Sequence, residues 1–184
     1  MIYILDCGST KTKFIHQMVD EYIECTTIPF FDFRIEEAKE VAGIIISGAP
    51  ILVTEENMEP YIASSNWIKT TNIPLLGICF GHQLIGIQFG SIAKKMKEDR
   101  EMSEIEIFES SPIFSRLPRV IQMQEDHCEF ISVPNHFKLL ASSDNCFHEA
   151  MQHEEKVIFG IQFHPEVSGN HGSMIIENFL KLCV

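Results

Sequence analysis

The sequence has 184 residues, of which 45 % are hydrophobic and 22 % charged, and its 26 acidic and 14 basic residues give a formal net charge of −12. This length suits one domain with a sizeable core, so we expect a single domain over residues 1–184. The negative charge repels phosphate backbones and anionic lipids, which argues against nucleic acid and membrane surfaces as partners. Because the chain opens on a strand-like pattern without the basic region of a signal peptide, we expect a cytoplasmic protein.

Apolar runs of strand length alternate with amphipathic stretches through the first half of the chain. This alternation predicts strands over 2–5, 25–29, 43–46 and 73–78, separated by helices over 14–22, 35–42 and 58–71. The runs 43–46 and 73–78 are apolar at successive positions, which is typical of central parallel strands covered on both faces. The first half therefore indicates βαβ units.

After Gly90 the pattern changes to shorter strands with period-two alternation, joined by turns that contain proline. We expect strands over 103–108 and 156–163 and a closing helix over 173–183. The fold that we predict is an open, mostly parallel α/β sheet flanked by helices, flavodoxin-like in class.

The six cysteines lie far apart, with no C-x-x-C motif and no paired Cys/His spacing, so we expect neither a disulfide framework nor a metal site. Cys79 lies between Gly77 and Gly81, where a predicted strand ends and a helix begins. The glycines permit a sharp turn, and the turn places the sulfur at a helix N-terminus, whose dipole favours a thiolate. A buried structural cysteine in a glycine-rich turn would have the same pattern, so this motif alone leaves both interpretations open.

A second motif lies at the end of a later apolar strand and contains His164 and Glu166, separated by Pro165. In an extended segment, residues two apart project to the same side, so the carboxylate can lie behind the imidazole ring and stabilise an imidazolium. Together with the turn at Cys79, this motif favours catalytic roles over that of a surface histidine.

A third motif, the segment 47–50, also follows an apolar strand. Loops at the carboxyl ends of parallel strands meet in the ligand crevice, so the N–H groups of this segment and of Phe80 could form an oxyanion hole. A plain turn explains the segment equally well when it is taken by itself.

Taken together, the three motifs resemble the signature segments of class I glutamine amidotransferases, over essentially the whole chain; they are Ser47-Gly48-Ala49-Pro50, Gly77-Ile-Cys79-Phe-Gly81-His-Gln83 and Phe163-His164-Pro-Glu166-Val167. The resemblance implies that the Cys79 thiolate attacks the glutamine amide, that His164 protonates the departing ammonia, and that Glu166 supports the histidine. It further implies an oxyanion hole from the backbone of Ala49 and Phe80, and glutamine contacts at Gly48, Gln83 and His127. For Gln83, a solvent-facing position in the first helical turn is an equally good interpretation.

Other segments resemble the amidotransferase part of GMP synthases, above all 141–146 and 149–151. No glycine-rich phosphate loop occurs and the sequence ends after the closing helix, so we expect no cofactor in this chain. The resemblance implies that the partner is a separate ATP-pyrophosphatase subunit, which would use ATP and Mg²⁺ to convert XMP to GMP.

The sequence departs from the family pattern at four places: Thr10 replaces a glutamine, Ala49 a glycine, Asp126-His127-Cys128-Glu129 the segment Ser-His-Gly-Asp, and Gly169-Asn170 the pair His-Thr. Two other functions remain open at this level. One is a γ-glutamyl hydrolase or peptidase that uses the same Cys and His, and the other is a non-enzymatic binding or regulatory module.

Overall fold

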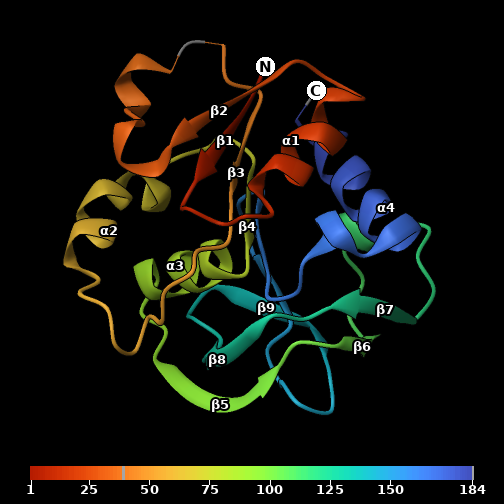
Figure 1. The fold of residues 1–184 in the computed structure, drawn as a ribbon. Coiled ribbons are helices and arrows are strands. Elements are labelled where there is room, and N and C mark those ends of the chain that lie inside the picture. Colours follow the sequence, from red (N-terminus) through yellow and green to blue (C-terminus); the bar gives the residue numbers. More distant parts are fainter. Residues whose placement is uncertain (39, 184) are drawn as a thin grey trace.

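The computed structural model of the protein describes residues 1–38 and 40–183, and a nine-stranded sheet crosses this part of the chain (Figure 1). Five adjacent strands of the sheet run parallel, in the order β2 (Cys25–Pro29), β1 (Ile2–Asp6), β3 (Gly43–Ile46), β4 (Leu75–Ile78) and β11 (Ile158–Ile161). This order is the flavodoxin-like one, which brings the carboxyl ends of β3, β4 and β11 to one edge. The predicted open, mostly parallel α/β fold is confirmed for this half of the sheet.

Four further strands extend the sheet beyond β11, and each pairs antiparallel with its neighbour. They are β10 (Ala150–His153), β9 (Phe137–Ser142), β6 (Met102–Ile107) and β7 (Val120–Gln124). A separate two-stranded sheet joins β5 (Ala93–Asp99) to β8 (His127–Ile131). The shorter strands expected after Gly90 are confirmed by these elements.

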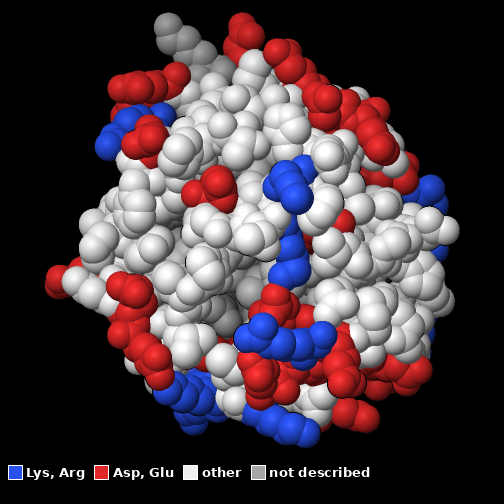
Figure 2. Space-filling model, viewed as in Figure 1, with Lys and Arg blue, Asp and Glu red and all other residues white. Residues whose placement is uncertain are grey.

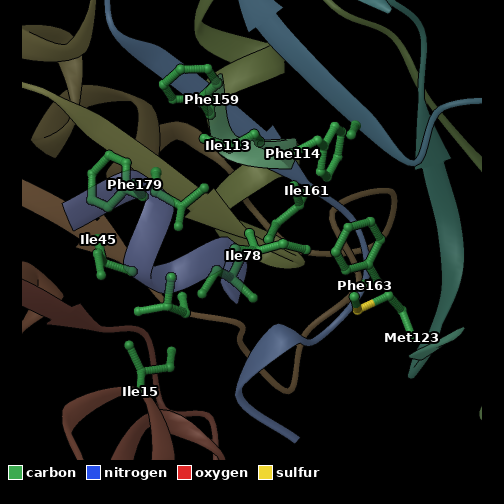
Figure 3. Close-up of a cluster of buried hydrophobic side chains, with 14 of the residues drawn as sticks. Ile15, Ile45, Ile78, Ile113, Phe114, Met123, Phe159, Ile161, Phe163 and Phe179 are labelled. Atoms are coloured by element: carbon green, nitrogen blue, oxygen red, sulfur yellow. The ribbon is translucent and has the colours of Figure 1, made fainter. Parts of the chain in front are cut away.

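Helices cover both faces of the parallel strands. Helices α1 (Thr12–Asp20) and α4 (Gly169–Leu180) lie next to each other on one face, over a core that includes Ile78 and Phe159 (Figure 1 and Figure 3). Helices α2 (Glu59–Ser64) and α3 (Phe80–Gln88) lie over a second core on the other face. The central strands are apolar at every position because both of their faces are buried.

Two of the expected helices do not form as continuous α-helices. The range 35–42 forms only a single 3₁₀ turn, Ile35–Glu37, and residue 39 in that range lies outside the described residues. Ile35, Ala38 and Val41 pack against the core from an irregular segment, and this packing outweighs helix propensity.

The range 58–71 is divided at Ser65 into α2 and a 3₁₀ helix, Asn66–Lys69. The Ser65 hydroxyl donates to the carbonyl of Tyr61 at 2.6 Å and accepts from the Gln88 amide at 2.7 Å. A serine hydroxyl that bonds back to the preceding turn competes with helix continuation, which accounts for the break.

The visible face in Figure 2 carries acidic side chains in several groups around its edge, in keeping with the net charge of −12. In the described part of the chain, no helix has the length and hydrophobicity needed to cross a membrane.

Candidate active site

Cys79 lies in a strained turn between β4 and α3. Its backbone has φ 52° and ψ −103°, a conformation that side-chain-bearing residues rarely adopt. A Cβ on Gly77 would lie 2.4 Å from the carbonyl carbon of Gly81, and a Cβ on Gly81 would lie 2.3 Å from the carbonyl oxygen of Ile46. The turn therefore requires both glycines, as the sequence predicts, because backbone segments pass each other within contact distance.

His164 and Glu166 form a buried pair directly after β11. Nδ1 of His164 lies 2.7 Å from Oε1 of Glu166, and both side chains are buried. The predicted placement of the carboxylate behind the ring is confirmed, although Pro165–Val167 forms a 3₁₀ turn and not an extended segment. The pair leaves the other ring nitrogen of His164 available for proton transfer.

The electrostatic surroundings favour a protonated His164. Burial alone lowers the pKa of this ring, but the adjacent Cys79 and the hydrogen-bonded Glu166 outweigh burial and raise the pKa to about 10. An imidazolium beside the sulfur at neutral pH is the arrangement that stabilises a thiolate nucleophile.

Gly48 lies against both Cys79 and His164. A Cβ at this position would lie 3.2 Å from Cε1 of His164 and 3.7 Å from Cβ of Cys79. The loop that contains Gly48 is attached to its neighbours through Ser47, whose carbonyl accepts from the N–H of Gly81 at 3.2 Å and whose hydroxyl accepts from the N–H of Cys7 at 2.9 Å. The loop 47–50 and the nucleophile turn thus form one connected unit.

The backbone of His164 is hydrogen-bonded to β7, the edge strand at the antiparallel end of the nine-stranded sheet. Its N–H donates to the carbonyl of Gln124, the last residue of β7, at 2.9 Å, and its carbonyl accepts from the Ser168 hydroxyl at 2.6 Å. Ser168 accepts in turn from the N–H of Gln124 at 2.9 Å. His164 is therefore fixed by both the parallel and the antiparallel halves of the molecule.

Gln162 is a site residue to which the sequence analysis assigned no role. Its Nε2 donates to Sγ of Cys79 at 3.6 Å, and its Oε1 accepts from Nε2 of Gln83 at 3.1 Å. The signal was present in the sequence, because the two-residue spacing that links His164 to Glu166 also places Gln162 on the side of His164.

A cavity of about 320 Å³ opens in front of Cys79. Four other predicted site residues border it, namely Ala49, Phe80, Gln83 and His127, whereas Gly48, His164 and Glu166 are not among the residues that line it. Phe80 occupies the first position of α3, where an N–H has no acceptor within the helix. The rest of the wall comes from three segments, 50–52, 98–100 and 126–129.

Gln83 is buried at the cavity wall and does not face solvent. Besides Gln162, its amide contacts the carbonyl of Glu129 at 3.3 Å. His127 also borders the cavity, but its ring nitrogens face protein atoms: Nδ1 lies 2.9 Å from the carbonyl of Glu129, and Nε2 lies 3.0 Å from Oε2 of Glu125.

The segment that replaces the family's Ser-His-Gly-Asp organises the rim of the cavity. The Glu129 carboxylate accepts from the N–H of Val53 at 2.7 Å and from the N–H of Thr54 at 3.1 Å, which holds the loop after residue 50 against the cavity. Asp126 pairs with Lys11 and lies 3.6 Å from Arg100. Burial tends to raise the pKa of Asp126, but these cations hold it below its usual value.

Residues 3–183 match the sequence model of the family described as glutamine amidotransferase class-I. One relative, a subunit of the glutamine-hydrolysing GMP synthase of Pyrococcus abyssi, is 39 % identical over 194 residues, covering 100 % of this chain and 98 % of that protein. The protein of the same name from Methanocaldococcus jannaschii is 35 % identical over 191 residues, covering 100 % and 97 % of the two chains.

Solved structures agree with these sequence relationships. A Thermoplasma acidophilum protein assigned to the same GMP synthase subunit superimposes with a TM-score of 0.90 at 31 % identity, covering 99 % of this chain and 92 % of that chain. A glutamine amidotransferase from Thermotoga maritima, 17 % identical, shares the fold with a TM-score of 0.76 over 90 % of this chain and 76 % of its own. With its cysteine elbow, buried His-Glu pair and full-length relatives, the chain belongs to the class I glutamine amidotransferase family.

Proposed function

We propose that this chain hydrolyses L-glutamine to glutamate and ammonia and passes the ammonia to a separate synthetase subunit that converts XMP to GMP. The observation that carries the chemistry is the buried His164 ring, which lies 2.7 Å from the Glu166 carboxylate through Nδ1 and packs, with Cys79, against Gly48. The support for the GMP branch is that relatives named for a subunit of glutamine-hydrolysing GMP synthase align over the entire chain.

In the first half-reaction, the Cys79 thiolate attacks the amide carbon of glutamine. The resulting oxyanion accepts hydrogen bonds from the N–H groups of Ala49 and Phe80, both at the cavity wall. His164 donates its proton to the departing nitrogen, so that ammonia leaves and a γ-glutamyl thioester remains on Cys79.

In the second half-reaction, neutral His164 accepts a proton from a water molecule that attacks the thioester carbon. Collapse of this intermediate breaks the C–S bond, releases glutamate and restores the thiolate–imidazolium pair. Glu166 keeps the ring oriented and stabilises its positive charge in both steps.

The cavity suits a single amino acid. Its volume of about 320 Å³ is at the lower end of the range for small-molecule sites. Arg100 at the rim can attract the α-carboxylate, and Glu98 and Asp126 can attract the α-ammonium group. Gln83 and the ring carbons of His127 would complete the contacts to glutamine.

The partner that we propose is an ATP-pyrophosphatase subunit, on which ATP and Mg²⁺ would act. We further propose that the reaction takes place in the cytoplasm, since a reducing compartment keeps the Cys79 thiol reactive and the six cysteines are free in the described structure.

The experiment is glutamate release from glutamine by the purified chain, alone and with the ATP-pyrophosphatase subunit of a GMP synthase, ATP, Mg²⁺ and XMP. Activity that increases with the partner and yields GMP supports the whole proposal. Hydrolysis that is indifferent to the partner retains glutaminase chemistry and contradicts the GMP assignment. Faster hydrolysis of γ-glutamyl peptides than of free glutamine would favour the hydrolase alternative, and no turnover of either substrate would favour a binding module.

A further inference from the structure

A second group of chemically reactive side chains is buried beside the glutamine cavity. It consists of Glu125 and His127, at the junction of β7 and β8, and Cys146 and Glu149, in the segment before β10. One ligand-type atom each from His127, Cys146 and Glu149 lies within 4.8 Å of the others, and Nε2 of His127 lies 3.0 Å from Oε2 of Glu125. Glu125 and Glu149 have no exposed surface, and Cys146 is 2 % exposed.

The polar atoms of this group lack partners within the described part of the chain. Both carboxylate oxygens of Glu125, Nε2 of His127 and Oε2 of Glu149 are buried without a hydrogen bond. Nε2 and Oε2 of Glu125 are close together but are not aligned as donor and acceptor. Unpartnered buried carboxylates are costly, and among the described residues no lysine or arginine forms an ion pair with either glutamate.

Nδ1 of His127 and Oε1 of Glu149 contact residues outside the group. Nδ1 of His127 lies 2.9 Å from the carbonyl of Glu129, so Nε2 is the ring nitrogen that faces the group. The Ser143 hydroxyl donates to Oε1 of Glu149 at 2.7 Å and leaves Oε2 free. Hydrogen bonds of this kind orient metal ligands in proteins, where the second atom of each ligand is held by a neighbour.

We propose that Glu125, His127, Cys146 and Glu149 form a binding site for Zn²⁺. The donor set of one imidazole nitrogen, one sulfur and two carboxylates is one that Zn²⁺ accepts, and the sulfur argues against Mg²⁺ and Ca²⁺. The closed, buried position of these side chains indicates a structural site and not a catalytic one.

The charge of the group supports a cation at this position. Glu125 and Glu149 are both fully buried, and within the described part of the chain neither carboxylate forms an ion pair with a lysine or an arginine. A divalent cation would neutralise the two carboxylates without a protein counter-charge.

A bound Zn²⁺ would connect two segments that are distant in sequence. Residues 126–129 form part of the cavity wall, and residues 143–149 precede β10, so the metal would connect the cavity wall to the segment before β10. The Cys and His ligands belong to different segments and have no short spacing between them, so the sequence pattern indicates no metal site here.

The test is metal binding by the full chain without a histidine tag, carrying Cys79→Ala so that the nucleophile cannot act as a ligand. The chelator-treated protein is titrated with Co²⁺, a spectroscopic substitute for Zn²⁺. We expect one Co²⁺ per chain, with a thiolate-to-cobalt charge-transfer band and the visible bands of tetrahedral Co²⁺, both abolished by added Zn²⁺.

Two cysteine variants locate the metal. Cys146→Ser should remove the charge-transfer band. Cys25→Ser is the matched control, because His16, Asp20 and Cys25 form a half-exposed group with comparable spacing. The band should persist in Cys25→Ser, and its loss there, or its survival in Cys146→Ser, would overturn the proposal.

Ser143→Ala gives a test that leaves every ligand in place. It should weaken Co²⁺ and Zn²⁺ binding roughly 10- to 100-fold, as is typical of a lost hydrogen bond to a ligating carboxylate. Circular dichroism verifies that each variant is folded. Unchanged affinity in Ser143→Ala, or no metal binding by the folded parent chain, would also overturn the proposal.

Discussion

The side-chain amide of Gln162 donates to the sulfur of Cys79, with 3.6 Å between Nε2 and Sγ, and Gln83 fixes the orientation of that amide. A donor directed at the sulfur stabilises its anionic form. We predict that Gln162→Met, which keeps the length of the side chain and removes the donor, lowers kcat roughly 10-fold, equivalent to about 1.4 kcal/mol.

The same variant should react more slowly with iodoacetamide at neutral pH, a readout that depends on the thiolate and not on glutamine binding. Gln122→Met is the matched control, since Gln122 pairs with Glu104 on the surface of β7. Alkylation and kcat at the parent rate in Gln162→Met would remove Gln162 from the site.

Substitution of Cys79 and of His164 tests the proposed nucleophile and the proposed general acid and base separately. Cys79→Ala should abolish glutamine hydrolysis and leave the fold intact, because alanine fits the same turn with a smaller side chain. His164→Ala should lower the rate roughly 10²- to 10⁴-fold, the usual contribution of a general acid–base group. Glutamate release measures both, and turnover at the parent rate in Cys79→Ala would disprove the mechanism.

The alkaline limb of the pH–rate profile should report on His164. With its pKa raised to about 10, His164 remains an imidazolium through neutral pH and loses its proton, and with it the ability to protonate ammonia, as the pH rises through about 10. Glu166→Gln removes one of the interactions that raise this pKa, so the alkaline limb of kcat/KM should move to lower pH.

The same shift affects the stability of the fold. A histidine pKa that is raised from 6.5 to about 10 on folding contributes stability that is fully present below pH 6.5 and is lost as the pH rises through about 10. Glu166→Gln should therefore reduce the melting temperature at neutral pH more than it does above pH 10. An unchanged alkaline limb in this variant would show that Glu166 does not act on the histidine charge.

Glu129 should affect substrate binding more than chemistry. Its carboxylate holds the N–H groups of Val53 and Thr54 at the cavity rim, and hydrogen bonds to a charged group contribute about 1.5 to 3 kcal/mol each. We predict that Glu129→Gln raises KM for glutamine several-fold with a smaller change in kcat. Glu55→Gln, which breaks an exposed ion pair with Lys95 just beyond the same loop, should leave both constants unchanged.

The elements that the sequence predicts well are those whose pattern follows from burial. Strands β3 and β4 are apolar at every position because helices cover both faces, and their predicted ranges agree with the structure to within two residues. The residues at which helices begin are less predictable. Helix α4 begins at Gly169, four residues before the expected helix, because Gly172 packs against the turn at Pro165. A Cβ on Gly172 would lie 1.9 Å from the carbonyl oxygen of Pro165. That contact depends on the tertiary structure and leaves no periodic signal.

In the site, the residues that could be predicted lie close together in sequence or in a recognisable turn. Cys79 is marked by its two glycines, and His164 and Glu166 by their spacing. The hydrogen bonds that the Gln124 carbonyl and the Glu129 carboxylate accept could not be predicted, since each joins segments that are far apart in sequence and meet only in the folded chain. The oxyanion and glutamine-binding roles of Ala49, Phe80, Gly48, Gln83 and His127 stay predictions, although these residues are gathered around one cavity and its nucleophile.

Because Cys79 has a positive φ, the residue that reactivity requires at this position is less favourable for the stability of the fold than glycine would be. A side chain in this conformation costs roughly 1 to 3 kcal/mol, a cost that glycine avoids. Selection for thermal tolerance alone would therefore favour glycine at position 79, and only selection for turnover would retain a cysteine there. A descendant chain that no longer hydrolyses glutamine could therefore gain stability by a single substitution, Cys79→Gly, which removes the nucleophile.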